Sequence, residues 1–211
     1  MKKEDSNQRK NQEMRENRCR CKWCNLKNIK YVEYHDKEWG VPQYEDYRLF
    51  ELLILEGFQA GLSWECILNK RESFRKPFDN FELDRVCSYD EEKIQELMAN
   101  PDIIRNYRKI CAAVNNAKIF RLIQQEYRSF SEYLWHYTDY KIIYECDKTS
   151  SELSDQISRD LKKRGMKFVG TTIIYAYLQA IGMIYSHDEE CFLYRGAESN
   201  TPQQAGGALN L

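Results

Sequence analysis

Apolar residues in the middle of the chain recur at the spacing of helices and not at that of strands. A first helix is expected to be capped by Asp46 and to end at Gly57, and its buried face carries Leu49, Phe50, Leu53 and Ile54. A longer helix is expected over about residues 103–125, with an apolar stripe formed by Ile104, Ile110, Val114 and Ile119.

Residues that begin or end helices divide the rest of the folded region. Ser63 is expected to cap a helix that runs to about Phe74, and Ser88 with Glu91 forms a capping box for a helix that ends at Asn100. The expected later caps are Ser131 and Ser154, and the glycines expected just after helix C-termini are Gly165 and Gly182. Since no segment alternates with period two over the length of a strand, we predict an all-α domain of about seven or eight helices without an internal repeat.

The two ends of the chain differ from the middle in composition. Residues 1–18 are almost entirely charged or amide residues, and residues 196–211 are rich in small and amide residues. We therefore expect a disordered basic arm, a helical domain over residues 19–195 and a flexible tail. The first 30 residues carry ten basic and four acidic side chains, although the whole chain has a formal net charge of −1. General attraction to nucleic acid is therefore expected to be weak.

Length and composition exclude several classes of protein. A chain of 211 residues with 42% hydrophobic residues can bury a core without disulfide bonds. The N-terminal sequence has no apolar segment of a signal peptide, so we expect a cytoplasmic protein, associated with the nucleoid in a bacterium, whose cysteines are thiols or metal ligands. No apolar stretch approaches the roughly 18 to 20 residues that span a bilayer, so we expect no membrane partner. We also expect a monomer.

Cysteine and histidine residues gather near both ends of the folded region. His187 and Cys191 are spaced H-x-x-x-C, which places both side chains on one face of a helical turn and supplies half of a zinc site. The other half must come from the N-terminal segment. Spacing slightly favours the C-x-x-C pair Cys21 and Cys24, and the alternative pairs Cys21 with His35. Unligated thiols and a surface histidine are a third interpretation.

Aromatic residues flank one carboxylate in the sequence. Glu56 ends an apolar run, and the aromatic residues around it are Tyr31, Tyr34, Trp39 and Trp64. A carboxylate in this position is either an exposed helix-end residue, which is the commoner case, or a buried acceptor that awaits a donor. The functional interpretation is a pocket in which aromatic rings sandwich a flat, cationic ligand while Glu56 accepts a hydrogen bond from its edge. Single aromatic residues are otherwise typical of core packing.

Four longer strings carry a family pattern. They are RCKW at residues 20–23, YHDKEWGVP at 34–42, LEGFQAGLSW at 55–64 and KRGMKFVGTT at 163–172. In this order and spacing they resemble the DNA-3-methyladenine glycosylase I family, and the resemblance extends over about residues 20–191. It implies an all-α fold of the helix-hairpin-helix glycosylase superfamily, in which one structural zinc ion joins the N- and C-terminal segments.

The resemblance also implies site residues. Those that match the family's metal ligands are Cys21, His35, His187 and Cys191, so the resemblance favours His35 over Cys24 and leaves Cys24 and Cys19 without a role. Those that match its base pocket are Glu56, Trp64 and Tyr34, and less closely Tyr31, Trp23 and Trp39.

A DNA-anchoring hairpin is implied at residues 102–110. Asp102 stands where the family usually has glycine; a positive φ there would carry a steric cost, and its charge would face phosphate. Because the whole chain is not basic, local side chains must contact the DNA backbone, and we expect these to be Arg105, Arg108 and Lys109.

The activity that the resemblance implies is hydrolysis of the N-glycosidic bond of 3-methyladenine in alkylated double-stranded DNA, after base flipping, with free 3-methyladenine as product. Because alkylation at N3 makes the base cationic, the leaving group needs little general-acid catalysis. We expect Glu56 to act mainly in recognition and electrostatics, and secondarily in water activation. No lysine is clearly placed to form a Schiff base, although Lys109 is the one to examine, so we expect a monofunctional enzyme.

Two other functions fit parts of the sequence. A zinc-linked DNA-binding module would recognise distorted duplex without excision, but it would not need Glu56, Trp64 and Tyr34 together. A redox or metal sensor would use the cysteine-rich N-terminal segment, and zinc content that survives mild oxidation would argue against that role.

Overall fold

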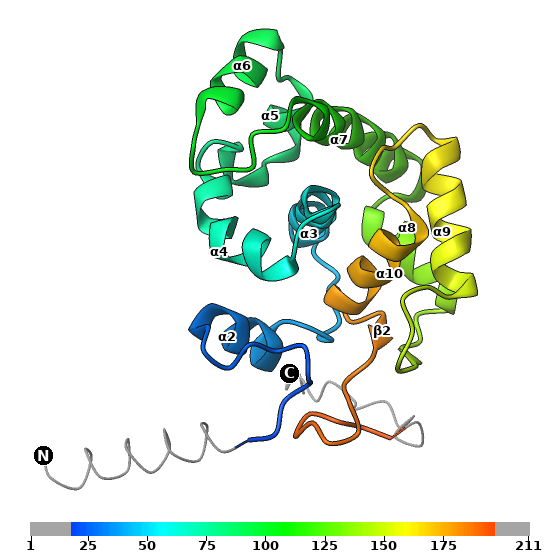
Figure 1. Cartoon of the computed structure of the whole chain (residues 1–211). Helices are drawn as coiled ribbons and strands as arrows, with labels where there is room; N and C mark the ends of the chain where they lie inside the picture. The colour runs from blue at the N-terminus through cyan, green and yellow to red at the C-terminus, as the bar shows by residue number, and fades with distance from the viewer. Residues whose placement is uncertain (1–17, 197–211) are drawn as a thin grey trace, which may run out of the picture. The chain divides into compact units, whose positions relative to one another are not determined.

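The computed structural model describes residues 18–196 (Figure 1). The arm and the tail expected from the sequence lie almost entirely outside these residues. The chain divides into two compact units, one formed by Lys22–Ser186 and the other by the residues up to Cys21 together with those from His187. Within the part that the structure describes, no helix is long and apolar enough to cross a membrane.

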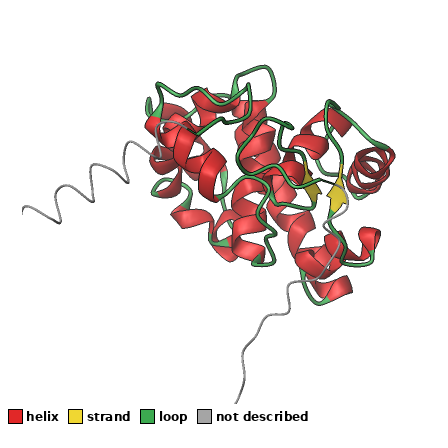
Figure 2. Cartoon of the chain, turned by 90° about the horizontal axis from the view of Figure 1, so that it is seen from below, coloured by secondary structure: helices red, strands yellow, loops and turns green. Residues whose placement is uncertain are grey.

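The unit Lys22–Ser186 is built almost entirely from helices (Figure 2). Its α-helices are α2 (Ile29–Lys37), α3 (Asp46–Gln59), α4 (Trp64–Arg75), α5 (Leu83–Cys87), α6 (Glu91–Ala99), α7 (Tyr107–Tyr127), α8 (Phe130–Trp135), α9 (Glu152–Lys163) and α10 (Thr171–Ala180). The 3-10 helices are η1 (Asp79–Phe81) and η2 (His136–Thr138). The prediction of a mainly helical fold is confirmed.

Two very short strands complete the unit. β1 (Ile143–Tyr144) and β2 (Ile184–Tyr185) pair in parallel, with Ile143 opposite Ile184. The sequence analysis expected no strand. Segments of two residues cannot show the alternation by which strands are recognised.

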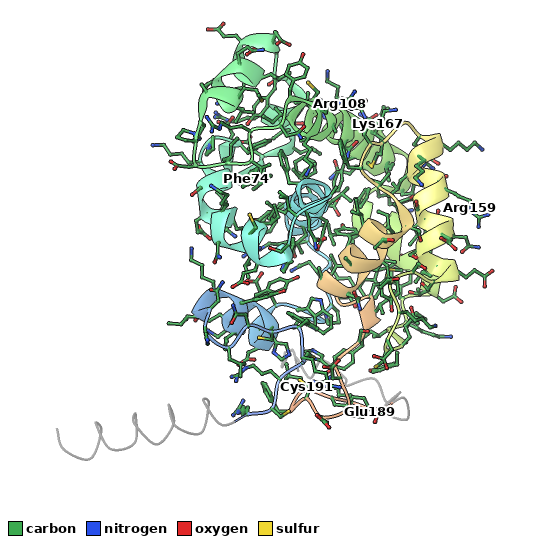
Figure 3. The ribbon with its side chains drawn as sticks, viewed as in Figure 1. Phe74, Arg108, Arg159, Lys167, Glu189 and Cys191 are labelled. Carbon is green, nitrogen blue, oxygen red and sulfur yellow. The ribbon has the colours of Figure 1, made fainter. Side chains whose placement is uncertain are left out.

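Helix α3 lies at the centre of this unit, where Figure 1 shows it nearly end-on, and it contacts α4, α7, α8 and α10. Neighbours on several sides explain why almost every residue between Leu49 and Phe58 is buried. Phe58 packs edge-on against Phe74 of α4, labelled in Figure 3, with 4.8 Å between ring centroids. The buried part of this helix, from Leu49 to Phe58, gives a polar side chain within it a dry environment.

Several predicted helix ends are confirmed. Ser63 caps α4 by accepting the backbone N–H of Cys66 at 3.2 Å. Gly165 and Gly182 follow the ends of α9 and α10 with φ of +98° and +70°, a backbone conformation that glycine adopts without steric cost.

Other predicted caps lie two or three residues from the observed ones. Asp90, Ser129 and Ser151 cap α6, α8 and α9, where the sequence suggested Ser88, Ser131 and Ser154. Ser154 is the third helical residue, whose hydroxyl accepts the N–H of Ser151, while its own N–H donates to Ser151. The capping chemistry was therefore predicted in the right segments, but residues that can cap a helix lie close together in sequence and compete for the same position.

Asp46 and Gly57 also differ from expectation. Asp46 is the first residue of α3, and its carboxylate accepts the N–H groups of Phe130 and Ser131, both at 2.8 Å, so it stabilises the start of α8. Gly57 does not end α3, which continues to Gln59.

A buried ion-pair network connects α3 and α4 to the residue after α2. Arg71 of α4 donates two hydrogen bonds to Glu51 of α3, both at 3.1 Å, and a third to Glu38 at 2.7 Å. Burial opposes ionisation of Glu51, but hydrogen bonds from Arg71 and Arg75 outweigh it and hold the pKa of Glu51 below its usual value. The network therefore fixes three elements that carry candidate site residues.

Candidate functional site

Glu56 is a buried acceptor on the inner side of α3. Only 2% of the residue is exposed, and its Oε2 has no hydrogen-bond partner among residues 18–196. Burial raises the pKa of this carboxyl group to about 8. The exposed helix-end interpretation is therefore wrong. A buried carboxyl oxygen without a partner is unfavourable in a folded protein, and a ligand that donates a hydrogen bond would satisfy it.

Tyr34 is close enough to this carboxyl group to be affected by its charge, and Trp64 packs against Tyr34. Their ring centroids are 5.3 Å apart, with the rings tilted by 48°, and both residues are buried. Burial first, and then the charge of Glu56, raise the pKa of Tyr34 well above its usual value. The Nε1 of Trp64 is also buried and has no partner within the described residues. The structure thus brings together two aromatic rings, an unsatisfied acceptor and an unsatisfied donor.

Trp23, Tyr31 and Trp39 form an adjoining aromatic group. The ring of Trp23 lies 5.4 Å from that of Tyr31 and 4.7 Å from that of Trp39, centroid to centroid. Burial, followed by the charges of Cys24, Glu65 and Glu56, raises the pKa of Tyr31 to about 12. Tyr31 is therefore close enough to Glu56 to be affected by its charge, whereas Trp23 and Trp39 pack on each other and on the ring of His35.

The segment expected to anchor DNA, residues 102–110, spans the loop between α6 and α7 and the first turn of α7. Asn106 caps α7, and Arg105 and Arg108 are exposed and make no hydrogen bond or ion pair with any residue that the structure describes (Figure 3 labels Arg108). Asp102 is not among the residues with positive φ, and its N–H donates to the side chain of Asn100 at 2.9 Å. The steric cost considered for Asp102 therefore does not arise.

Lys109 is placed differently from the two arginines. It is only 8% exposed, and its Nζ donates to the backbone oxygens of Phe58 and Ala60 at 2.8 and 2.6 Å. Burial lowers the pKa of its ammonium group. The sequence analysis grouped Lys109 with the exposed basic residues, but in the structure its side chain is buried and hydrogen-bonded to the end of α3. Its spacing along the helix could have indicated that it is buried, because the buried residues Ala112, Ala113 and Asn116 lie on the same face of α7.

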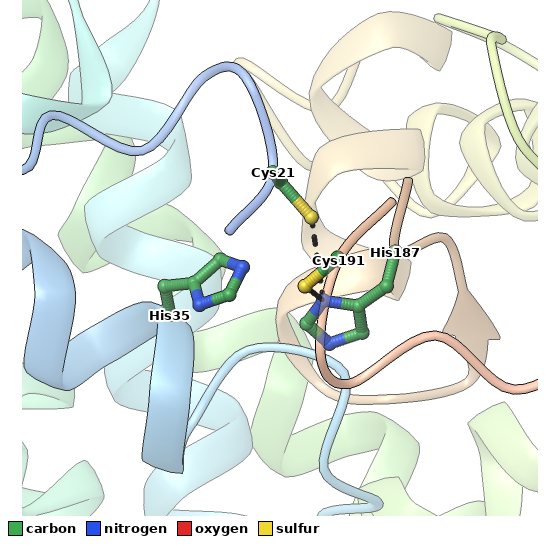
Figure 4. A group of neighbouring side chains, drawn as sticks. All are labelled: Cys21, His35, His187 and Cys191. Atoms are coloured by element: carbon green, nitrogen blue, oxygen red, sulfur yellow. Dashed lines mark hydrogen bonds between the residues drawn. The ribbon is translucent and has the colours of Figure 1, made fainter. Parts of the chain in front are cut away.

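Three candidate metal ligands meet in the unit formed by the two ends of the chain (Figure 4). The Nδ1 of His187 lies 3.4 Å from the Sγ of Cys21 and 3.5 Å from the Sγ of Cys191, and all three residues are buried. Backbone N–H groups of Asp188 and Leu193 donate to the two sulfurs. Two buried thiols and an imidazole form a cluster that could hold a metal ion, and N–H donors to sulfur suit thiolate ligands.

The two rivals for the fourth ligand lie in the other unit. His35 of α2 is fully buried, and its Nδ1 lies 2.8 Å from the carboxylate of Asp36, the pairing that metal-binding histidines typically show. Cys24 is also buried, and its Sγ lies 3.9 Å from the backbone oxygen of Tyr31. The Cys/His group found among the described residues does not include Cys24, so the C-x-x-C set favoured by spacing is not supported.

Comparisons with known proteins show which family the chain resembles. A family model described as methyladenine glycosylase matches residues 23–194. DNA-3-methyladenine glycosylase 1 of Escherichia coli (strain K12) is 39% identical over 183 residues, which cover 84% of this chain and 97% of that protein.

Solved structures show the same relationship. A crystal structure of a 3-methyladenine DNA glycosylase I matches with a TM-score of 0.80 and 39% identity, and the match covers 84% of this chain and all of that one. A variant of such an enzyme in complex with 3-methyladenine matches with a TM-score of 0.76 and 36% identity, covering 78% of this chain and 92% of that one.

Proposed function

Because the chain belongs to the methyladenine glycosylase family, we propose that it hydrolyses the N-glycosidic bond of 3-methyladenine in alkylated double-stranded DNA. Enzymes of this kind are DNA-3-methyladenine glycosylases, hydrolases that act on N-glycosyl bonds. The observation that carries the proposal is the buried Oε2 of Glu56, which lacks a partner among residues 18–196. Its charge acts on Tyr34, whose ring packs against that of Trp64.

Recognition of the damaged base follows from the charge that alkylation adds. Attachment of a methyl group at N3 makes the adenine ring of the nucleotide cationic, and a cationic ring is attracted to the faces of Tyr34 and Trp64. Its exocyclic amino group can donate to the unpaired oxygen of Glu56. A positive ring beside Glu56 also favours the ionised carboxylate, so base binding and loss of the carboxyl proton support each other. Neutral adenine provides neither effect.

The reaction needs little proton transfer to the leaving group. When the bond between C1′ and the base breaks, its electron pair neutralises the positive charge of the alkylated ring. Water then adds at C1′, and its proton passes to solvent or to the carboxylate of Glu56. The protein's work is to extrude the nucleotide, hold the ring and exclude competing bases. The engagement of the Lys109 ammonium with two carbonyl oxygens supports a monofunctional hydrolysis without a Schiff base.

For DNA binding, we propose that α6, the loop after it and α7 form the helix-hairpin-helix anchor. Arg105 and Arg108 are exposed there and unpaired among the described residues, so they are free to contact phosphates. Contacts of this kind position the protein without reading sequence, which suits an enzyme that must search for damage anywhere.

For metal binding, we propose one structural zinc ion held by Cys21, His187 and Cys191 with His35 as the fourth ligand. The support is the buried thiol and imidazole cluster and the pairing of His35 with Asp36. Zinc would stabilise the ends of the chain and would take no part in the reaction. Purified protein should contain one zinc per chain, Cys24→Ser should retain it and Cys191→Ser should lose it with a lower melting temperature. Loss of zinc from Cys24→Ser with full retention in His35→Ala would restore the C-x-x-C set.

The proposed activity is tested by incubating the protein with methylated duplex DNA and identifying any released base. Free 3-methyladenine is then titrated into the wild type, Glu56→Gln and Trp64→Ala, with Glu92→Gln as a matched control on an exposed glutamate of α6. Glu56→Gln should bind the base much more weakly, because an amide also presents donors. Trp64→Ala should lose about 1 to 3 kcal/mol, the usual value for one base stacked on an aromatic ring.

The outcomes separate the candidate functions. Binding to methylated duplex without release of a base would favour the DNA-binding module. Unchanged affinity for 3-methyladenine in both pocket variants would place the base site elsewhere.

A further inference from the structure

A buried ammonium group links the DNA-anchoring segment to the end of α3. Lys109 belongs to the first turn of α7, immediately after the loop that carries Arg105, and the side chain of Asn106 accepts its backbone N–H at 3.2 Å. Its side chain leaves this loop and ends on the backbone oxygens of Phe58 and Ala60. One residue is therefore bonded to the loop through its backbone and to α3 through its side chain.

The two acceptors lie where backbone oxygens most need a partner. The last four carbonyl groups of a helix have no intrahelical donor, and α3 ends at Gln59, between Phe58 and Ala60. A positive charge at a helix C-terminus is also favoured by the helix dipole. Burying a lysine here removes its charge from water, which is unfavourable. Water molecules could satisfy the carbonyl groups at the end of a helix without this loss.

The turn held in this way separates the two central residues of the candidate pocket. Glu56 lies one residue before Gly57 in the last turn of α3, and Trp64 opens α4. Between them the chain reverses through Gly61, whose φ is +77°. Ser63 fixes the far end of the turn by capping α4, whereas Lys109 fixes its near end. The distance between the carboxyl group and the indole ring depends on both attachments.

We propose that Lys109 is a positioning residue, which holds the turn between Glu56 and Trp64 in the shape that the base requires and connects that turn to the DNA-anchoring loop. This inference rests on the proposed function, because it assumes that the base binds at Glu56 and Trp64. It differs from the role of the neighbouring arginines, since Lys109 acts through protein contacts and not through DNA.

If Lys109 is a positioning residue, its loss should lower the affinity for the free base and leave the affinity for DNA nearly unchanged. Loss of a DNA contact would do the opposite. Lys109→Met keeps most of the length of the side chain but removes its terminal ammonium group and donors, and Arg108→Met is the matched control one residue away. Free 3-methyladenine, which needs no DNA contact, should bind Lys109→Met at least tenfold more weakly and bind Arg108→Met as it binds the wild type. Affinity for undamaged duplex should fall in Arg108→Met and change less than twofold in Lys109→Met.

A pH profile provides a readout that mere loss of stability would not imitate. Lys109 is not among the groups that shift the ionisation of Glu56, so the pH dependence of base binding should keep its midpoint in Lys109→Met while the affinity falls. Lys109→Arg, which keeps a charged donor, should recover part of the affinity. If Lys109→Met does not fold, Lys109→Gln takes its place, because its shorter amide cannot reach both oxygens.

Each result is decisive. Wild-type affinity for the free base in a folded Lys109→Met or Lys109→Gln protein would overturn the inference. Loss of DNA affinity with unchanged base affinity would make Lys109 a DNA contact instead. If the wild type fails to bind 3-methyladenine, or Glu56→Gln binds it equally well, the proposed pocket fails, and that failure is recognised before any Lys109 variant is compared.

Discussion

Replacing Glu56 by glutamine should make the free energy of unfolding less dependent on pH. The carboxyl group has a pKa of about 8 in the folded chain, raised by burial from the ordinary 4.5. Between these values the folded state holds a proton that the unfolded state releases. The stability that this group contributes is therefore fully present below pH 4.5 and is lost as the pH rises through 8. Glutamine does not titrate, so the variant lacks this loss.

The magnitude follows from the two pKa values. One pKa unit corresponds to 1.36 kcal/mol, and for a shift from 4.5 to about 8 the loss between pH 5 and pH 9 is about 4 kcal/mol. The quantity to compare is the difference in unfolding free energy between variant and wild type at each pH. All other titrating groups cancel in it, and the constant cost of burying an amide shifts it equally at every pH.

The assay is equilibrium unfolding in urea at several pH values between 5 and 9, with metal content checked for both proteins. The difference should change by about 4 kcal/mol in favour of Glu56→Gln as the pH rises. A difference that stays constant within 1 kcal/mol would show that Glu56 ionises in the folded chain as it does in water. That result would refute the argument that a dry, central helix holds this carboxyl group protonated.

Three further measurements test other parts of the structure. In excision assays at subsaturating DNA, kcat/KM of the wild type should rise about tenfold from pH 7 to pH 9, because the ionised fraction of a group with a pKa of about 8 rises by that factor. Glu56→Gln should lack this rise. A flat wild-type profile would contradict a role of the ionised Glu56 carboxylate in excision. Arg105→Ala and Arg108→Ala should each lower the slope of log affinity for DNA against log salt by about one, with unchanged binding of the free base, and an unaltered slope would remove that arginine from the interface. Glu51→Leu should destabilise the fold by about 3 to 5 kcal/mol in urea unfolding, because it leaves the buried guanidinium of Arg71 without its main partner. The double variant Glu51→Leu with Arg71→Met should recover most of this loss. Equal stability of the single and double variants would contradict the pairing.

The helical pattern of the sequence predicted the central parts of the fold well. The periods of α3 and α7 are visible because each helix buries an apolar face over many residues. Helix starts were less certain, since Ser88 and Asp90 are both good caps and only the packed backbone decides between them. The two strands were missed because each has only two residues.

The candidate site could be predicted only in part, for two physical reasons. Composition alone favours an exposed Glu56, because buried carboxyl groups without partners are rare, and the family resemblance was needed to suggest otherwise. Spacing alone favoured Cys24 over His35, because it describes neighbours along the chain and not which side chain turns toward a distant segment. The contact of Lys109 with α3 joins residues about 50 positions apart, which local patterns do not report.

The cluster of Cys21, His187 and Cys191 can form only late in synthesis of the chain. Cys21 and His187 are separated by 166 positions in the chain, so a growing polypeptide exposes the first thiol long before its partners leave the ribosome. At about 5 to 20 residues per second, that interval is roughly 8 to 33 seconds. During this time Cys21 is open to oxidants and to other soft metals. Under oxidative stress, Cys21 would therefore be more accessible to oxidants in a growing chain than in a finished molecule, where its thiol is buried.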